Sequence, residues 1–294
     1  MVVLQSKEVS NLTEPLPIWR SIFSQGMTVL AFLLTAIALL PLFSVLIEIL
    51  RRGAPYLRWE VLTSLPAPVG MTDTPNGFGN AIVGTLMMVG IASIISIPLG
   101  ILAAIYLSEF GKQKPIARAV RFVVTILSGI PSIVVGVFAF GVIVIAFNGF
   151  SALAGGFALA VIMLPIVILA TEEALKLVPT HQRLASAALG ANPIQTTFKI
   201  VVASALPGIT TGVLLAVARA AGETAPLIFT ALFTQDWPQG LLKPAPSLSV
   251  LIYNYANSAF AEQNQLAWTA SFILLAMVLL TNILSRLATR KRLS

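Results

Sequence analysis

The sequence of 294 residues contains no cysteine, a single histidine and few charged side chains. Without cysteine the chain has neither disulfides nor thiolate metal sites, and His181 by itself cannot form a zinc site. Only 10% of the residues are charged, whereas a soluble domain carries about 25%. Hydrophobic residues make up 57% of the chain. We therefore predict an all-α integral membrane protein with several spans.

Motifs for nucleotide hydrolysis and for common enzyme chemistry are also missing. The sequence holds no G-x-x-x-x-G-K-[ST] phosphate loop, since its Gly111–Lys112 pair is followed by glutamine and has no upstream glycine at the required spacing. It holds no H-E-x-x-H motif and no nucleophile elbow. A membrane enzyme is therefore disfavoured, and any ATPase that drives this protein must be another chain.

Six apolar segments have the length of membrane-spanning helices. Each contains about 19 residues or more, which is what a hydrocarbon core of about 30 Å requires. The segments are Met27–Ile47, Ala81–Leu107, Phe122–Phe147, Ser151–Ala170, Ile209–Phe233 and Leu266–Leu284.

The distribution of positive charge predicts the orientation of these spans. An even number of spans places both termini on the same side of the membrane. If that side is the cytoplasm, thirteen Lys and Arg residues lie inside and four lie outside, with Arg219 inside a span. The positive-inside rule favours this arrangement. It also explains the net charge of +7 without a nucleic-acid partner.

Proline, glycine and charge divide the chain into four regions. The loop Leu50–Asn80 is rich in proline and glycine, as an irregular external loop is. The polar start of the chain has no signal-peptide cleavage site, and its basic end suits an anchor facing anionic lipid. The predicted regions are a cytoplasmic tail (1–26), a first helix with its external loop (27–78), a five-helix core (79–286) containing a cytoplasmic loop (171–206), and a basic cytoplasmic tail (287–294).

Two opposite charges, Arg219 and Glu223, lie inside the fifth predicted span. A charge at the centre of a membrane helix costs about 2.5–3.5 kcal/mol on insertion scales. The i, i+4 spacing places both side chains on one helix face. That face must point at protein or water, so the pair either pins neighbouring helices together or lines a solute path. We take Arg219, Glu223 and the adjacent Thr224 as candidate path residues.

Three residues inside the second and third spans are predicted to disturb their helices. Pro98 removes a backbone hydrogen bond and clashes with the preceding turn, so we expect a kink there. Gly129 and Pro131 are predicted to break the third span. That break is either a packing kink or a discontinuous helix whose free backbone groups face a pathway.

The cytoplasmic loop contains two predicted short helices. Pro179 can begin the first, and Gly190 can end it at the C′ position. Asn192 and Pro193 suit the N-cap and the first position of the second helix. Such a helix-turn-helix serves either as an interfacial anchor or as a docking element for a soluble partner.

The decamer Ala218–Leu227, A-R-A-A-G-E-T-A-P-L, resembles the signature of the phosphate ABC-transporter permeases, the PstA and PstC subunits. The strings Y-L-S-E-F (106–110) and G-I-P-S-I-V (129–134) resemble stretches of the same permeases. The resemblance implies the MetI-like permease fold of ABC importers, with a cytoplasmic coupling helix. Six spans without a long insertion favour the PstA type.

The cytoplasmic loop also resembles the "EAA" motif of ABC permeases, in which E-A-A is followed by three residues, a glycine, nine residues and I-x-L-P. Gly190 matches the glycine, and Ile200 follows at the required spacing. Ala185 and Ser186 occupy the two small-residue positions. The resemblance implies that these four residues couple the permease to an ATPase. Three positions depart from the motif, since leucine replaces its glutamate and Val-Ala replaces its Leu-Pro: Leu184, Val202 and Ala203.

The resemblance implies a permease subunit of an ATP-driven importer of inorganic phosphate in the bacterial inner membrane. It further implies a PstC-like second permease, a PstB-like ATPase dimer that holds ATP and Mg²⁺, and an external PstS-like phosphate-binding protein. This chain itself would bind no cofactor or metal. The alternatives are a permease for another oxyanion, and a passive channel or ion-coupled carrier. A carrier is expected to show two related halves, and the sequence shows no internal repeat.

Overall fold

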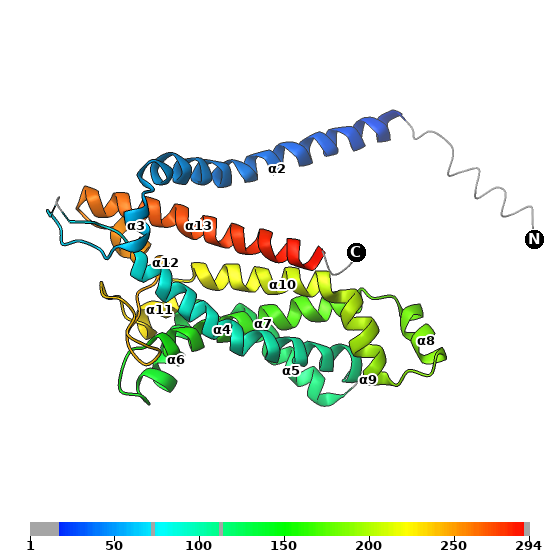
Figure 1. Ribbon diagram of the computed structural model, residues 1–294. Helices are drawn as coiled ribbons and strands as arrows, with labels where there is room; N and C mark the ends of the chain where they lie inside the picture. Colours follow the sequence, from blue (N-terminus) through cyan, green and yellow to red (C-terminus); the bar gives the residue numbers. More distant parts are fainter. Residues whose placement is uncertain (1–17, 72–73, 112–113, 291–294) are drawn as a thin grey trace, which may run out of the picture. The chain divides into compact units, whose positions relative to one another are not determined.

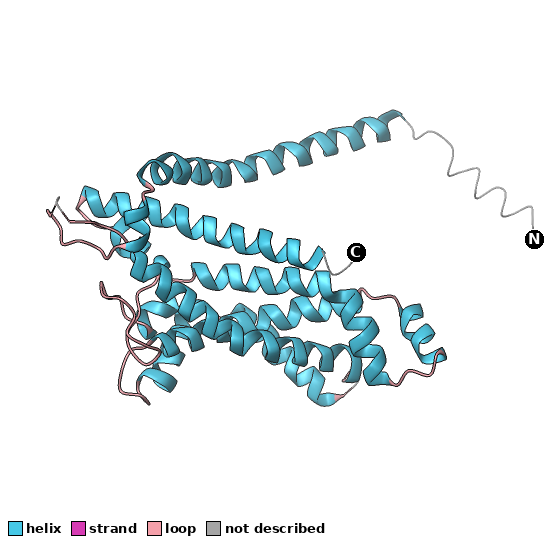
Figure 2. Ribbon diagram, viewed as in Figure 1, coloured by secondary structure: helices cyan, strands magenta, loops and turns pink. Residues whose placement is uncertain are grey.

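The computed structural model describes residues 18–71, 74–111 and 114–290, and every regular element in these residues is a helix (Figure 2). The chain divides into two compact units, Met1–Arg51 and Arg52–Ser294. In chain order the elements are α2 (Ile18–Gly53), η1 (Ala54–Tyr56), α3 (Trp59–Thr63), α4 (Gly79–Ile105), η2 (Tyr106–Phe110), α5 (Pro115–Gly129), α6 (Ser132–Ala139), η3 (Phe140–Val144), α7 (Ala152–Lys176), α8 (Thr180–Ala188), α9 (Pro193–Gln195), η4 (Thr196–Val201), α10 (Val202–Gly222), α11 (Ala225–Thr230), α12 (Leu248–Ala256) and α13 (Ala261–Arg290).

The first unit consists of α2 for almost all of its described length. This helix has 36 residues and contains Pro41. It begins at Ile18, earlier than the predicted Met27, so residues 18–26 of the predicted tail are helical. The rest of that predicted tail, residues 1–17, lies outside the described residues.

Five helical stretches in the described residues are long and apolar enough to cross a membrane. The pair of α5 and the helix after it, Pro115–Gly129 and Ser132–Val144, is bent by 106° at a short break and forms either a broken span or a re-entrant loop. The described residues thus contain five candidate spans, or six if this bent pair, which covers most of the predicted third span, counts as one. The five long stretches are Ile18–Tyr56, Gly79–Phe110, Ala152–Lys176, Pro193–Gly222 and Ala261–Ser285.

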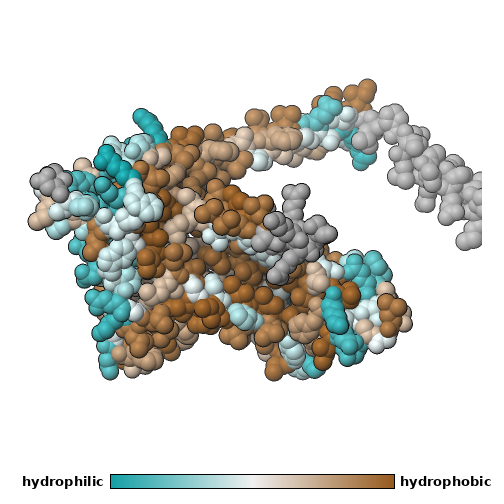
Figure 3. Space-filling model, in the orientation of Figure 1, coloured by the Kyte–Doolittle hydropathy of each residue, from teal (hydrophilic) through white to brown (hydrophobic). Residues whose placement is uncertain are grey.

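The second unit is a helical bundle whose two ends differ in structure. The short helices α6, α11 and α12 lie at one end, and α8 and α9 lie at the other (Figure 1). The C-terminal end of α13 lies toward the α8 end. Hydrophobic side chains cover the middle of the bundle, and hydrophilic ones gather at its two ends (Figure 3). This is the pattern that a hydrocarbon layer bounded by water requires.

The centre of the bundle is the close packing of α4 against α7. A Cβ atom on Gly156 would come within 2.6 Å of the Ile91 side chain, and one on Gly100 within 2.7 Å of Val167. Since the residue numbers rise together along both helices, α4 and α7 run in the same direction. Small residues bring the two backbones close, which is how membrane helices gain packing energy where lipid offers no hydrophobic drive.

Pro98 does not interrupt this packing. The structure keeps α4 continuous from Gly79 to Ile105 with Pro98 inside it, so the helix is not interrupted at this residue, and the predicted kink stays a prediction. The proline removes a single hydrogen bond, and the next turn packs against α7 at Gly100. Neighbouring helices commonly make an interior proline tolerable in this way.

The helix α12, which follows the last long loop, is largely buried although it is too short to span. Leu248, Leu251 and Tyr255 are buried in a hydrophobic cluster with residues of α4 and α13. The Tyr255 ring meets Phe233 edge-on, with centroids 6.0 Å apart. Burial raises the pKa of the Tyr255 phenol, so the side chain stays neutral. This helix therefore closes one end of the bundle instead of lying on its surface.

Candidate functional site

The predicted fifth span ends in the middle of the signature decamer. Helix α10 stops at Gly222, Glu223 is extended with φ −72° and ψ 129°, and α11 starts at Ala225. A single helix over Ile209–Phe233 is therefore wrong. Pro226 favours the break, because a proline in a continuing helix would lack the N–H for the Gly222 carbonyl and would clash with it.

This break changes the setting of the Arg219–Glu223 pair. Arg219 lies in the last turn of α10 and Glu223 just beyond it, so the pair sits at a helix end and not in mid-helix. Arginine is favoured there because the C-terminal carbonyls of a helix carry partial negative charge. Thr224 follows as the N-cap residue of α11, without a side-chain capping bond.

The ion pair itself is loose. Arg219 Nε lies 3.4 Å from Glu223 Oε1, longer than the 2.7–2.9 Å typical of charge-assisted hydrogen bonds. The Arg219 side chain is 54% exposed on this chain, whereas that of Glu223 is 15% exposed. Arginine has five N–H donors, and this geometry engages one of them. The guanidinium can therefore receive an anion from the open side.

Residues far away in the sequence hold this break in place. The N-terminal turn of α12 reaches it, because the Ser249 hydroxyl donates to the backbone carbonyl of Glu223 at 2.8 Å. The same turn is tied to α4, where Thr85 Oγ1 accepts from the Leu248 amide at 2.9 Å. Neither Ser249 nor Thr85 is distinguished in the sequence, since both are ordinary hydroxyl residues within apolar stretches.

The break in the third span lies beside α11. Ile130 and Pro131 have extended backbone angles between α5 and α6, so the predicted break at Gly129 and Pro131 is confirmed. Helix α6 packs tightly on α11, since a Cβ atom on Gly136 would come within 2.7 Å of the Pro226 Cα atom. Two interrupted helices thus adjoin one another. That their free backbone groups face a pathway stays a prediction.

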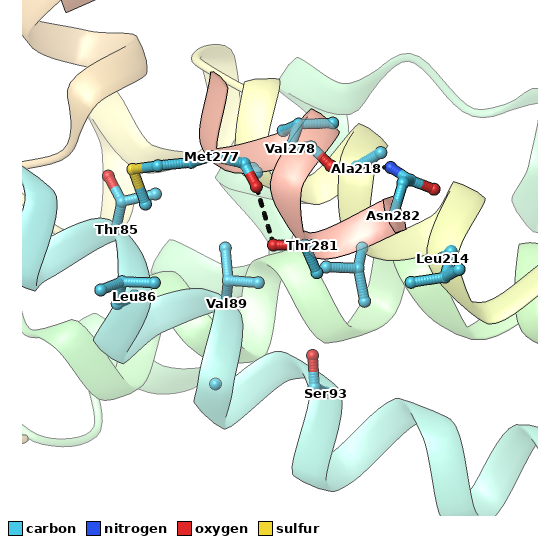
Figure 4. A pocket seen from close by; sticks show the side chains of 13 residues that line it. Thr85, Leu86, Val89, Ser93, Leu214, Ala218, Met277, Val278, Thr281 and Asn282 are labelled. Atoms are coloured by element: carbon cyan, nitrogen blue, oxygen red, sulfur yellow. Dashed lines mark hydrogen bonds between the residues drawn. The ribbon is translucent and has the colours of Figure 1, made fainter. Parts of the chain in front are cut away.

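A groove between α4, α10 and α13 lies close to the same region (Figure 4). Its volume is about 230 Å³, and Ala218 and Ala221 line it from α10. Four polar side chains interrupt a lining that is otherwise apolar: Thr85, Ser93, Thr281 and Asn282. None of the described residues that line it is charged. A multiply charged anion in this groove would be desolvated without a counter-charge, so the groove does not suit an anion.

The other candidate residues meet in the loop between α7 and α10. Ala185, Ser186, Gly190 and Ile200 all line one hollow with a volume of about 500 Å³. Gly190 has φ +81°, the left-handed conformation expected of a C′ glycine. The buried Ser186 hydroxyl bonds that of Thr196 at 2.9 Å, which ties α8 to η4.

The second helix of this loop begins as predicted. Asn192 and Gln195 form a capping box, with Pro193 at the first helical position. The helix then continues through η4 into α10 and forms one span, Pro193–Gly222. Within the predicted stretch 171–206, α7 runs on to Lys176 and the next candidate span starts at Pro193.

Comparison with known proteins identifies the family. The model of the binding-protein-dependent transport system inner membrane component family matches residues 96–293. The phosphate transport system permease protein PstA of Haemophilus influenzae is 40% identical over 92% of this chain and 94% of its own length.

Two solved transporters share the fold. A chain of a bacterial alginate ABC transporter in complex with a periplasmic protein covers 92% of this chain and 98% of its own, with a TM-score of 0.62 and 17% identity. A chain of the MetNI methionine ABC transporter, in an inward-facing conformation, covers 72% of this chain and 93% of its own, with a TM-score of 0.58 and 21% identity. The all-helical structure with its membrane spans therefore has the fold of ABC importer permeases, and the chain belongs to the binding-protein-dependent transport system inner membrane component family.

Proposed function

We propose that this protein is the permease subunit of an ATP-driven importer, and that the transported solute is inorganic phosphate. The observation that carries the proposal is the 40% identity to a phosphate permease over almost the whole chain. The decamer Ala218–Leu227 lies within the family match. The half-exposed Arg219 guanidinium at the α10 end supplies the matching chemistry.

Phosphate suits an arginine whose donors are available. A multiply charged anion that enters a low-dielectric region needs a cation or several donors. The planar fork of arginine matches phosphate geometry. An unpaired arginine would hold the anion too tightly for release. Glu223 lies close enough to offset the charge of Arg219 when no anion is present, which suits a path better than a storage site.

The proposed partners are a second permease, an ATPase and an external binding protein, each of which would supply a part that this chain lacks. Arg219 is open at the surface of the chain, so a second, PstC-like permease would complete the path around it. The sequence has no phosphate loop, so ATP and Mg²⁺ would be bound by a PstB-like ATPase dimer. The hollow beside α8 gives that dimer a docking surface. An external PstS-like protein would deliver phosphate.

The orientation of the chain is part of this proposal. Both termini and the α8 loop would lie in the cytoplasm, as the ratio of thirteen to four positive charges favours. In this orientation α8 meets the ATPase, and the end with α6, α11 and α12 faces the binding protein. The chain would lie in the bacterial inner membrane.

Reconstitution tests the proposal. The chain is purified with its co-expressed partners, placed in liposomes with ATP on the α8 side, and assayed for uptake of radiolabelled phosphate. We expect uptake that depends on ATP and on the binding protein and that excess sulfate does not inhibit. Uptake of sulfate in place of phosphate would identify another oxyanion permease. Phosphate flux without ATP would identify a channel or carrier. Sulfate uptake and ATP-independent phosphate flux would each contradict the proposal.

A further inference from the structure

Arg183 joins the helix α8 to the end of α4 through a two-point ion pair. Its Nη2 lies 2.9 Å from Glu109 Oε1, and its Nε donates to Glu109 Oε2 at 3.2 Å. Glu109 belongs to η2, the π-helical segment that continues α4. The two side chains are 18% and 9% exposed, so water screens the pair only in part. Such paired contacts fix direction as well as distance.

The same guanidinium also binds the end of α7. Arg183 donates to the backbone carbonyl of Leu175 at 3.0 Å and to that of Val178. These carbonyls belong to the last turn of α7 and the residues after it, where a helix leaves acceptors without partners. One side chain of α8 therefore holds two of the central helices of the bundle, α4 through Glu109 and α7 through its carbonyls.

We propose that Arg183 is a positioning residue, and that the Arg183–Glu109 pair carries displacement of α8 into α4 and α7. The inference rests on the proposed function, in which α8 meets the ATPase. The "EAA" pattern would place a glutamate where this chain has Leu184, and Arg183 supplies a polar anchor one position earlier. The Y-L-S-E-F string (106–110) contains Glu109 and would therefore be the segment that α8 displaces.

The two faces of α8 support this role. Its apolar residue Leu184 is 65% exposed, and Leu189, which follows the helix, is 90% exposed, so these residues are free to enter a partner's groove. The contacts of α8 with its own bundle are polar. Besides Arg183, Gln182 accepts from Ser204 at 3.2 Å, and Ser186 bonds Thr196. If a partner binds the apolar face of α8, we expect a movement of the partner to displace α8, and the polar contacts on the other face to pass that displacement to the bundle.

A second arginine shows that η2 is held from two directions. Arg121 of α5 donates to the Leu107 carbonyl at 2.7 Å and to Glu172 of α7 at 2.8 Å. Its contacts tie α5 to the bundle and do not include α8. A π-helical segment is a local irregularity that is frequently found at functional sites. Arg183 therefore connects α8 to the bundle at the π-helical segment η2. Helix α5 contacts the same segment through Arg121 and ends at the break at Ile130.

Matched variants separate coupling from assembly. Arg183→Gln and Glu109→Gln each remove the ion pair, whereas Arg118→Gln removes one exposed positive charge of α5 and serves as the control. The measured quantity is phosphate imported per ATP hydrolysed by the complete complex in liposomes. We expect both pair variants to assemble and to hydrolyse ATP, with import per ATP lowered at least about fivefold, in the range of known coupling between sites. The control should match the wild type.

The double variant Arg183→Gln with Glu109→Gln tests whether the two residues act as a unit. If they do, it should transport no worse than Arg183→Gln alone, because the ion pair is already broken in the single variant. Additive losses would overturn the pairing. Should Arg183→Gln fail to assemble because the α7 carbonyls lose their donor, Glu109→Gln carries the test, since it keeps the size of the side chain.

A distance measurement tests the link without relying on transport. The chain has no cysteine, so spin labels at Ala187→Cys on α8 and Ile116→Cys on α5 are unique, and both positions are exposed. We expect the distance distribution to broaden in both pair variants and not in Arg118→Gln. An unchanged distance distribution in both pair variants would overturn the proposal, and so would unchanged import per ATP. If the wild-type complex hydrolyses ATP but imports no phosphate, the proposed substrate fails, and stimulation of ATP hydrolysis by the binding protein replaces import as the readout.

Discussion

The hydroxyl of Ser249 donates a hydrogen bond to the backbone carbonyl of Glu223 at 2.8 Å. This bond joins the first turn of α12 to the point where α10 has ended and α11 has not yet begun. It gives a partner to a carbonyl that the helix break leaves outside regular helical bonding. The backbone of Glu223 is thereby held while its carboxylate remains beside Arg219.

Removing this bond should loosen the break. We expect Ser249→Ala to lower the free energy of unfolding by about 1–3 kcal/mol, the usual cost of leaving a buried acceptor unsatisfied. Thr125→Ala is the control, because Thr125 is exposed and bonds a carbonyl of its own helix. Thermal unfolding of the purified complex in detergent measures both. Equal melting temperatures for Ser249→Ala and the wild type would show that the bond does not hold the break.

The role of Arg219 is tested by three changes. Arg219→Gln should abolish phosphate uptake while the complex still assembles, because the path loses its cation. Arg219→Lys keeps the charge but loses the planar fork, so uptake should be impaired. The exchange of Arg219→Glu with Glu223→Arg keeps the pair but moves the cation to the extended residue beyond α10. If the variant with both exchanges takes up phosphate at a near-normal rate and is present in the membrane at normal levels, the pair has only a structural role.

Gly190 is expected to be required for its backbone conformation alone. A Cβ atom added there would meet nothing within 4 Å, but φ is +81°. Gly190→Val should therefore strain the turn by about 1–2 kcal/mol and lower import per ATP. Gly190→Asn is the matched control, since asparagine tolerates the left-handed region, and it should retain coupling. Equal import by the two variants would contradict the requirement for this turn.

Labelling from outside intact cells checks the orientation. Thr74→Cys lies in the loop before α4, and Ala187→Cys lies on α8; both positions are exposed. A thiol reagent that does not cross the membrane should modify Thr74→Cys only. Ala187 is a better probe than the neighbouring Ser186, which is buried. Modification of Ala187→Cys in intact cells would reverse the proposed topology.

Two glycines of α4 should respond to alanine in opposite ways. A Cβ atom on Gly84 would come within 2.0 Å of the Pro246 carbonyl oxygen, whereas one on Gly90 would meet nothing within 4 Å. We expect Gly84→Ala to cost about 1–3 kcal/mol of stability by overpacking. Gly90→Ala should be neutral or stabilise by up to about 1 kcal/mol, because alanine loses less backbone entropy in a helix. Melting temperatures of the two variants give the comparison, and a stable Gly84→Ala would contradict the close contact with Pro246.

Local signals in the sequence predicted several details of the fold. The break at Gly129 and Pro131 was predictable from local sequence, because glycine is a poor helix former and proline removes a backbone hydrogen bond. The turn at Gly190 and the Asn192 cap were predictable for the same reason, since each depends on a few adjacent residues. The continuity of the helix through Pro98 was not predictable in this way, because the close packing that supports it comes from α7, far along the chain.

The sequence alone determined the class of the protein, and it predicted six apolar segments that can cross a membrane and the candidate residues. Hydrophobic length and the scarcity of charge require burial in lipid for any fold of this chain. The tertiary structure decided how Arg219 and Glu223 are presented, because the end of α10 depends on Pro226 together with the packing of α6 and the reach of Ser249 from α12. It also decided that Arg183 meets Glu109, a contact between residues that are 74 positions apart. Periodicity describes one segment at a time, so such contacts become visible only when the helices are packed.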